Sequence, residues 1–269
     1  MESIDAPCPT TGVSARSRSV TSRRETPSPS RSASPACAPS PRFWLACERV
    51  FDVDADIETI GVHLSRDPFM APLVALRPGL RVPGGWDGFE LAVRAILGQQ
   101  VTVHAARRLA GRLVALCGEA LPTDGLLPGL SHAFPSPERL AAAELGAMGM
   151  PAARLAGIKA LAEAAIADRH LFRPLGTVEE AIARLRAIRG VGEWTAQYIA
   201  LRALRETDAF PARDIGLLRG AATNGGARPT PAALLRRAET WRPWRAYAAQ
   251  HLWAADAGRS RSPREVSHG

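Results

Sequence analysis

The chain has 269 residues, of which 46% are hydrophobic and 22% are charged, and its formal net charge is +8. A chain of this length and apolar content can bury one or two sizeable cores, which excludes a wholly disordered protein. No apolar run in the sequence approaches the roughly 18 residues that cross a bilayer, so we expect a cytoplasmic protein with no membrane partner. The four cysteines are far apart and have no Cys or His at metal-ligand spacing, which predicts neither a disulfide framework nor a metal site.

The positive charge is concentrated at the two ends of the chain. Residues 1–42 contain six Arg and three acidic residues, and residues 258–269 contain three Arg and one acidic residue. Both ends are rich in Ser, Pro and Arg and lack apolar periodicity, so they cannot offset their own ordering entropy. We therefore predict two disordered tails, and the total charge alone does not establish an anion-binding surface.

Apolar residues at helical spacing dominate the sequence between the two tails. Phe89, Val93, Ile96 and Leu97, for example, fall on one face of a helix. Alternating strand patterns are nearly absent, so we predict an all-α fold. In chain order, we expect helices at residues 86–100, 103–118, 136–145, 151–167, 177–188, 193–204, 230–241 and 243–256.

A Gly-Val-Gly turn, residues 190–192, separates the helices at 177–188 and 193–204. Thr177 and Glu180 form a capping box that starts the first helix, and the first glycine ends it. A nucleotide-binding loop would need a preceding strand and either a third glycine or a Lys-Ser/Thr pair, so we reject that interpretation. Two remain: a plain corner between helices, or a grip in which free N–H groups of the second helix bind a phosphate.

The helix after this turn is apolar on two sides. One stripe consists of small and aliphatic residues: Ala196, Ile199, Ala200 and Ala203. The nearly opposite stripe carries the aromatic residues: Trp194, Tyr198 and Leu201. The helix could be buried between two layers, or the aromatic stripe could line a cleft where a flat group stacks.

Asp214 opens a short apolar helical segment farther along the chain. Its simplest role is an N-cap. A carboxylate near an aromatic-lined cleft is also suited to breaking an N-glycosidic bond, because a fixed anion stabilises the oxocarbenium-like sugar and can orient the attacking water. The two roles are compatible.

Five segments in the same order resemble one known family. They are GQQ (Gly98–Gln100), GMPAARLAGIKALA (Gly149–Ala162), IRGVGEWTA (Ile188–Ala196), Asp214 and WRPWRAYAAQHLW (Trp241–Trp253). This pattern is similar to the helix-hairpin-helix DNA glycosylases, and within them to DNA-3-methyladenine glycosylase II, the AlkA-like branch. The resemblance covers roughly residues 45–257.

The resemblance implies a cleft between two helical lobes that binds double-stranded DNA with the damaged nucleotide flipped out of the duplex. Asp214 matches the catalytic aspartate. The substrate-binding positions are Trp194, Tyr198, Trp253 and Gln99. The DNA-binding positions are Gln100, Gly190, Val191, Gly192 and Thr195. We expect a monomer that acts at the nucleoid.

Two positions carry further expectations from the resemblance. Gln100 stands where the AlkA-like pattern has an apolar wedge, so base flipping would gain less from stacking. In relatives, backbone carbonyls of the hairpin hold a structural monovalent cation, here around Ile188 and Val191. No other cofactor is expected.

The resemblance implies hydrolysis of the N-glycosidic bond of alkylated bases such as 3-methyladenine in duplex DNA, which starts base excision repair. A cationic purine leaves without protonation, so no general acid is needed, and we expect His251 to be a helix-surface or packing residue. Members that cleave the strand place a Lys after the hairpin. Here Trp194 occupies that position and the only lysine is Lys159, which predicts a monofunctional glycosylase without lyase activity. Two alternatives stay open: a different base specificity, or a non-catalytic helix-hairpin-helix DNA-binding module.

The resemblance also divides the chain. We expect the N-terminal β-containing domain of relatives to be largely missing, with residues 43–60 as its last helix and linker. Residues 61–87 and 207–257 would form the helical lobe that carries the catalytic aspartate. Residues 88–206 would form the lobe with the hairpin.

Overall fold

The computed structural model describes residues 40–122, 129–222 and 226–261. Within these ranges the protein is mostly helical, which confirms the predicted all-α fold. The α-helices are α1 (Pro41–Phe51), α2 (Ile57–Leu64), α3 (Ala71–Leu76), α4 (Gly88–Leu97), α5 (Val103–Cys117), α6 (Pro137–Ala142), α7 (Ala152–Ala167), α8 (Val178–Arg186), α9 (Glu193–Ile199), α10 (Ile215–Gly220), α11 (Pro231–Ala238) and α12 (Arg245–Arg261). Two short strands, β1 (Glu119–Ala120) and β2 (His132–Ala133), pair antiparallel.

Helices extend into both predicted tails. α1 begins at Pro41 with Ser40 as its N-cap, and α12 continues to Arg261, past the predicted boundary at residue 258. Once a helix is nucleated, each added residue gains a backbone hydrogen bond for little loss of conformational entropy, so α12 continues beyond its apolar pattern. The rest of both predicted tails, 1–39 and 262–269, lies outside the described residues. No helix in the described part of the chain is long and apolar enough to cross a membrane.

Side-chain caps explain where most of these helices begin. At α2, α4 and α10 an Asp oxygen accepts a hydrogen bond from the backbone N–H three residues on. Ser or Thr does the same at α5, α6, α8 and α11. The capping box at α8 is confirmed: Thr177 Oγ1 accepts from the Glu180 N–H, and Glu180 Oε2 accepts from the Thr177 N–H.

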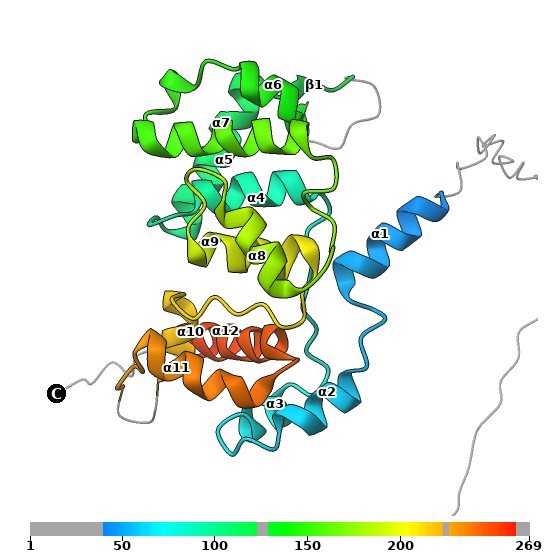
Figure 1. The fold of residues 1–269 in the computed structure, drawn as a ribbon, viewed down its shortest axis with the longest axis vertical. Coiled ribbons are helices and arrows are strands. Elements are labelled where there is room, and N and C mark those ends of the chain that lie inside the picture. The colour runs from blue at the N-terminus through cyan, green and yellow to red at the C-terminus, as the bar shows by residue number, and fades with distance from the viewer. Residues whose placement is uncertain (1–39, 123–128, 223–225, 262–269) are drawn as a thin grey trace, which may run out of the picture. The chain divides into compact units, whose positions relative to one another are not determined.

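Helix α4 lies at the centre of one group of helices. It packs against α5, α7 and α9, and its Val93, Ile96 and Leu97 side chains are completely buried. The aliphatic stripe predicted for the helix after the turn is also buried, because it faces this core. Figure 1 shows α4 to α9 gathered together in this part of the fold.

A second group of helices surrounds α12. This helix packs against α10 and α3, which come from distant parts of the sequence. Trp241 is completely buried here, and its Nε1–H donates to Asp67 Oδ2 at 2.7 Å. Figure 1 shows α10, α11 and α12 beside α2 and α3.

The segment at residues 82–85 connects the two groups. The Gly84 N–H donates to Val50 O at the end of α1. Arg205 donates to Val82 O and forms an ion pair with Asp52, which is only 5% exposed. The end of α1 and the segment after α9 are therefore held against the same stretch of chain.

Candidate functional site

Asp214 caps α10, as predicted. Its Oδ1 accepts a hydrogen bond from the Leu217 N–H at 3.0 Å. Its own N–H donates to Pro211 O at 2.8 Å, which closes a tight turn just before the helix. The cap and the turn together fix the direction of the carboxyl group.

Two tryptophan side chains from different helices converge on this carboxyl group. The Nε1–H of Trp194, on α9, donates to Asp214 Oδ2 at 2.9 Å, and that of Trp253, on α12, donates to Oδ1 at 2.8 Å. With the Leu217 N–H, three donors meet a group that has about four acceptor positions when ionised. One acceptor direction, on Oδ2, is left for a further donor. Because Asp214 is partly exposed, water or a ligand can reach it.

Trp194, Tyr198 and Trp253 form an aromatic wall beside Asp214, and all three are partly exposed. The Trp194 and Tyr198 rings stack with centroids 5.4 Å apart and an interplanar angle of 17°. Tyr198 and Trp253 meet edge to face with centroids 6.3 Å apart. A sandwiched base would need roughly 7 Å between two rings, twice a contact of about 3.5 Å. A flat base would therefore stack on the outside of the wall, not between its members.

One member of the predicted aromatic stripe was wrong. Leu201 is completely buried, whereas Tyr198 is partly exposed. A π-helical turn, Ala200–Leu204, follows α9 without a break and widens the helix there. Leu201 faces the core, and Arg202 lies next to the Tyr198 side chain.

Close packing around the carboxyl group depends on a glycine in α10. A Cβ atom on Gly216 would lie 3.0 Å from both Asp214 Oδ1 and Trp253 Cδ1. Contacts this short would push the indole or the carboxyl group away. Gly216 thus lets Trp253 lie against the first turn of α10, where its N–H reaches Asp214.

The turn between α8 and α9 is built on a glycine that no other residue can replace without strain. Gly190 has φ +85°, and a Cβ atom on it would lie 2.7 Å from Gly157 Cα in α7. The Val191 N–H donates to Ile188 O at 3.1 Å within the turn. α8 ends at Arg186, two residues before the predicted end of this helix.

The first turn of α9 has backbone N–H groups without a side-chain cap, because its N-cap is Gly192. Val191 and Thr195 are 5% and 2% exposed. Their side chains therefore cannot touch an external ligand, and only their backbone could provide the DNA contacts predicted for them. Glu193 in this turn is paired with Arg186 at 3.1 Å.

Gln99 lies beside the hairpin turn, and its predicted contact with the substrate stays a prediction. Its Nε2 donates to Gly190 O at 3.1 Å and to Thr195 Oγ1 at 2.9 Å. Both amide hydrogens are used to hold the turn, since the buried Thr195 hydroxyl needs a partner. The next residue, Gln100, is exposed with φ +56°. A side-chain-bearing residue rarely adopts this conformation, so the chain is strained where the polar wedge was predicted.

Family models match most of the chain. A model of the HhH-GPD superfamily of base excision DNA repair proteins matches residues 93–246, which include the hairpin and Asp214. The chain belongs to the HhH-GPD superfamily. A model of the AlkA N-terminal domain matches residues 33–87, so this segment of the HhH-GPD protein extends beyond the predicted remnant at residues 43–60.

Curated relatives of this HhH-GPD protein include a probable AlkA and a DNA-3-methyladenine glycosylase. A probable bifunctional transcriptional activator/DNA repair enzyme AlkA of Mycobacterium tuberculosis is 45% identical over 208 residues, which are 77% of this chain and 41% of the relative. DNA-3-methyladenine glycosylase 2 of Escherichia coli is 40% identical over 208 residues, which are 76% of this chain and 68% of the relative. The chain thus spans about two fifths of the length of the M. tuberculosis relative.

Solved structures share the HhH-GPD fold. The Schizosaccharomyces pombe 3-methyladenine DNA glycosylase in complex with abasic DNA matches with a TM-score of 0.59 and 27% identity, over 72% of this chain and 95% of that one. The 3-methyladenine DNA glycosylase from Archaeoglobus fulgidus matches with a TM-score of 0.68 and 23% identity, over 82% of this chain and 78% of that one. At that identity the second match shows the fold alone.

Two residues of the HhH-GPD site were missed in the sequence. Gln197 Oε1 accepts the Phe210 N–H at 2.8 Å and so ties α9 to the segment that leads to Asp214. Arg202 lies over the Trp253 ring. Arg202 follows Tyr198 by four residues, as Tyr198 follows Trp194, and this spacing could have placed Arg202 beside the aromatic residues on the same helix face.

His251 packs in the core of this HhH-GPD protein, on the same helix as Trp253, and is 4% exposed. Burial lowers its pKa to about 4, because a charged imidazole would lose its hydration. The side chain is therefore neutral near pH 7. It cannot donate a proton to a leaving base at that pH.

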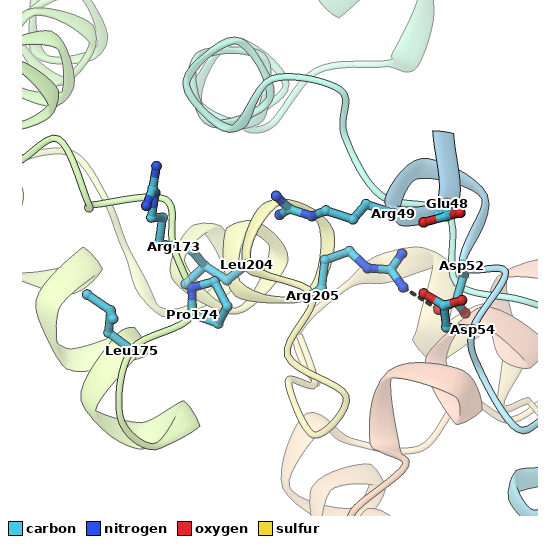
Figure 2. Close-up of a pocket in the computed structure, with 9 residues that line it drawn as sticks. All are labelled: Glu48, Arg49, Asp52, Asp54, Arg173, Pro174, Leu175, Leu204 and Arg205. Atoms are coloured by element: carbon cyan, nitrogen blue, oxygen red, sulfur yellow. Dashed lines mark hydrogen bonds and ion pairs between the residues drawn. The ribbon is translucent and has the colours of Figure 1, made fainter. Parts of the chain in front are cut away.

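A cavity of about 550 Å³ lies apart from the aromatic wall. Figure 2 shows that Glu48, Asp52 and Asp54 at the end of α1 lie across it from Arg173 and Leu175. The site residues predicted for an HhH-GPD glycosylase are not among those that line it. The chemistry therefore has to be argued from the carboxyl group and the wall, not from the size of a cavity.

Proposed function

We propose that this protein is a monofunctional DNA glycosylase that hydrolyses the N-glycosidic bond of alkylated bases such as 3-methyladenine in duplex DNA. The observation that carries the proposal is the convergence of Trp194, Trp253 and the start of α10 on Asp214. The E. coli relative, 40% identical to this chain, is named for the same activity. The substrate would be chromosomal DNA in the cytoplasm.

Asp214 would supply the negative charge that this reaction needs. Departure of the base develops positive charge on the sugar, which a fixed carboxylate stabilises. At 4 Å and an effective dielectric constant of about 20, the attraction is about 4 kcal/mol, or roughly a thousand-fold in rate. Oδ2 accepts a single indole N–H and so has a lone pair for the attacking water. The water adds to the sugar carbon, its proton passes to the carboxylate, and the base leaves with the bonding electrons.

The aromatic wall would bind the flipped base on its outer face. An alkylated purine carries positive charge, so it is attracted to the faces of indole and phenol rings. The same charge makes it a good leaving group that needs no proton. A neutral, buried His251 is consistent with this requirement.

The product would be an intact abasic site. Strand cleavage in this superfamily uses an amine that forms a Schiff base with the sugar. Trp194 stands at the position of that amine, and its N–H is bonded to Asp214. Lys159, the only lysine of the chain, belongs to α7 and is not part of the aromatic wall.

The hairpin would hold the DNA backbone. The uncapped N–H groups that open α9 can donate to a phosphate oxygen without reading the sequence. Ile188 O accepts the Val191 N–H and keeps a second lone pair, which fits a monovalent cation held by backbone carbonyls of the turn. Such an ion would stiffen the turn near the phosphate. Exposed Gln100 would enter the space left by the flipped base.

The test is incubation of the protein with methylated duplex DNA and identification of the released bases by chromatography. We expect release of 3-methyladenine, and a strand that breaks only after alkali treatment. Asp214→Asn should release base about a thousand times more slowly and still bind the duplex. Release at the wild-type rate by Asp214→Asn would remove this residue from the reaction. A folded wild-type protein that binds DNA and releases no base would be a DNA-binding module.

A further inference from the structure

Arg202 lies against the aromatic wall and is held from three directions. Its guanidinium carbon is 4.9 Å from the centroid of the Trp253 ring. Nη1 donates to Pro83 O at 2.8 Å, and Nη2 donates to Gln250 Oε1 at 2.9 Å. Its backbone O accepts the Gly85 N–H at 2.9 Å. The π-helical turn, the segment at 82–85 and α12 therefore meet at this one side chain.

The position of Arg202 in its helix also connects it to the other two rings. Trp194, Tyr198 and Arg202 follow one another at four-residue spacing, on one side of α9 and its π-helical extension. Burial lowers the pKa of Arg202, and the charge and hydrogen bonding of Tyr198 act in the opposite direction. An arginine keeps its proton in proteins. A full positive charge thus lies directly against the wall.

We propose that Arg202 fixes Trp253 in place for Asp214 and makes the wall discriminate against cationic bases relative to neutral ones. Arg202 would act on the reaction as a positioning residue. Its effect on base choice rests on the proposed glycosylase function, whereas its effect on the Trp253 ring does not.

The first part follows from how the ring is held. Trp253 makes its hydrogen bond to Asp214 from one edge, and this bond alone leaves the ring free to tilt about the N–H direction. The guanidinium group over the ring removes that freedom, because Arg202 is itself fixed by Pro83 and Gln250. A lysine would keep the charge but has no planar fork that can stack and donate in two directions at once.

The second part follows from the charge. A base stacked on the far face of Trp253 would lie roughly 8 Å from the guanidinium, given a ring contact of about 3.5 Å. At an effective dielectric constant of about 20, repulsion at that distance lowers the binding of a cationic base about thirty-fold, and solvent reduces this to about ten-fold. A neutral base feels no such penalty. Arg202 thus offsets part of the attraction between the wall and alkylated purines.

The experiment compares single-turnover base release from two duplexes, one with a cationic N7-methylguanine and one with a neutral hypoxanthine. Arg202→Gln should raise the ratio of the cationic to the neutral rate about ten-fold over the wild-type ratio. Arg202→Lys should leave the ratio unchanged and lower both rates several-fold. Arg173→Gln, which removes a charge from the exposed cavity of Figure 2, is the matched control and should alter neither.

A second measurement does not depend on activity. The indole N–H resonance of Trp253, assigned with Trp253→Phe, should shift or broaden in Arg202→Lys and Arg202→Gln but not in Arg173→Gln. A ratio in Arg202→Gln within two-fold of the wild type would overturn the role in base choice. Wild-type rates and a wild-type Trp253 resonance in Arg202→Lys would overturn the positioning role. This test remains available if Arg202→Gln does not fold. If the wild type releases neither of these bases and no 3-methyladenine, the glycosylase proposal fails, and the resonance still decides the positioning role.

Discussion

The hydrogen bonds around Asp214 predict that its amide variant is destabilised, in addition to its slower base release. Asn at this position keeps an oxygen for the Leu217 and Trp253 N–H groups, so the cap on α10 survives. Its Nδ2–H2 group would then stand 2.9 Å from Trp194 Nε1, with donor facing donor. In the flipped orientation the NH2 group of the Asn side chain would face both the Leu217 N–H and the Trp253 Nε1–H, so two donors would lose their acceptor. One part-buried N–H loses its partner, which costs about 1–3 kcal/mol of unfolding free energy.

A double-mutant cycle isolates this effect. Trp194→Phe removes the donor, so in combination with Asp214→Asn it removes the repulsion as well. Each single variant loses the same hydrogen bond, and a sum of the two counts it twice. The double variant should therefore be more stable than the sum predicts by at least about 1.5 kcal/mol, the value of a hydrogen bond to a charged group.

Urea unfolding followed by far-ultraviolet circular dichroism measures the cycle without relying on tryptophan fluorescence. Trp86→Phe is the matched control, because Trp86 is 62% exposed and is not bonded to Asp214. Its effect should add to that of Asp214→Asn within about 0.5 kcal/mol. A coupling that small between Trp194 and Asp214 would refute the arrangement of the indole N–H and the carboxylate described above.

Two further predictions concern pH and the hairpin. Burial lowers the pKa of His251 from 6.5 to about 4, so the unfolded state binds more protons between these values, and stability falls by up to about 3 kcal/mol as the pH drops through this window. In urea unfolding at several pH values, His251→Gln should flatten this dependence and exposed His104→Gln should keep it; the same slope in both variants would contradict the assignment. Gly190→Ala should cost at least about 2 kcal/mol, because of its φ of +85° and its close approach to α7, and should weaken DNA binding in fluorescence anisotropy. Gly111→Ala, in open space on α5, should match or slightly exceed wild-type stability, and a similar loss at both glycines would argue against the tight turn.

The parts of the site that depend on neighbouring residues could be predicted from the sequence. The capping box at Thr177, the glycine turn at Gly190 and the cap at Asp214 each use residues within four positions of one another. Such interactions form in the same way wherever the segment lies, so residue type and spacing are enough to predict them. The family resemblance then assigned a role to Asp214 that its own neighbourhood does not require.

The parts that depend on packing could not be predicted in this way. Trp253 reaches Asp214 across 39 positions, Gln99 reaches Gly190 across 91, and Arg202 reaches Pro83 across 119. The π-helical turn at Ala200–Leu204 and the burial of Leu201 within it have no signature in helical periodicity. The two hydrogen bonds that tie Gln99 to the hairpin turn could likewise not be predicted from its place in the loop.

By itself the sequence determined most of the helices from residue 86 onward, the caps at Thr177 and Asp214 and the glycine hairpin, because these follow from local chemistry. Only the tertiary structure decided that two indole N–H groups point at that carboxyl group and that an arginine lies against one of the rings. The reason is physical: both relations are set by how α9 and α12 pack together, and the direction of a side chain across a packed interface is a property of the whole core.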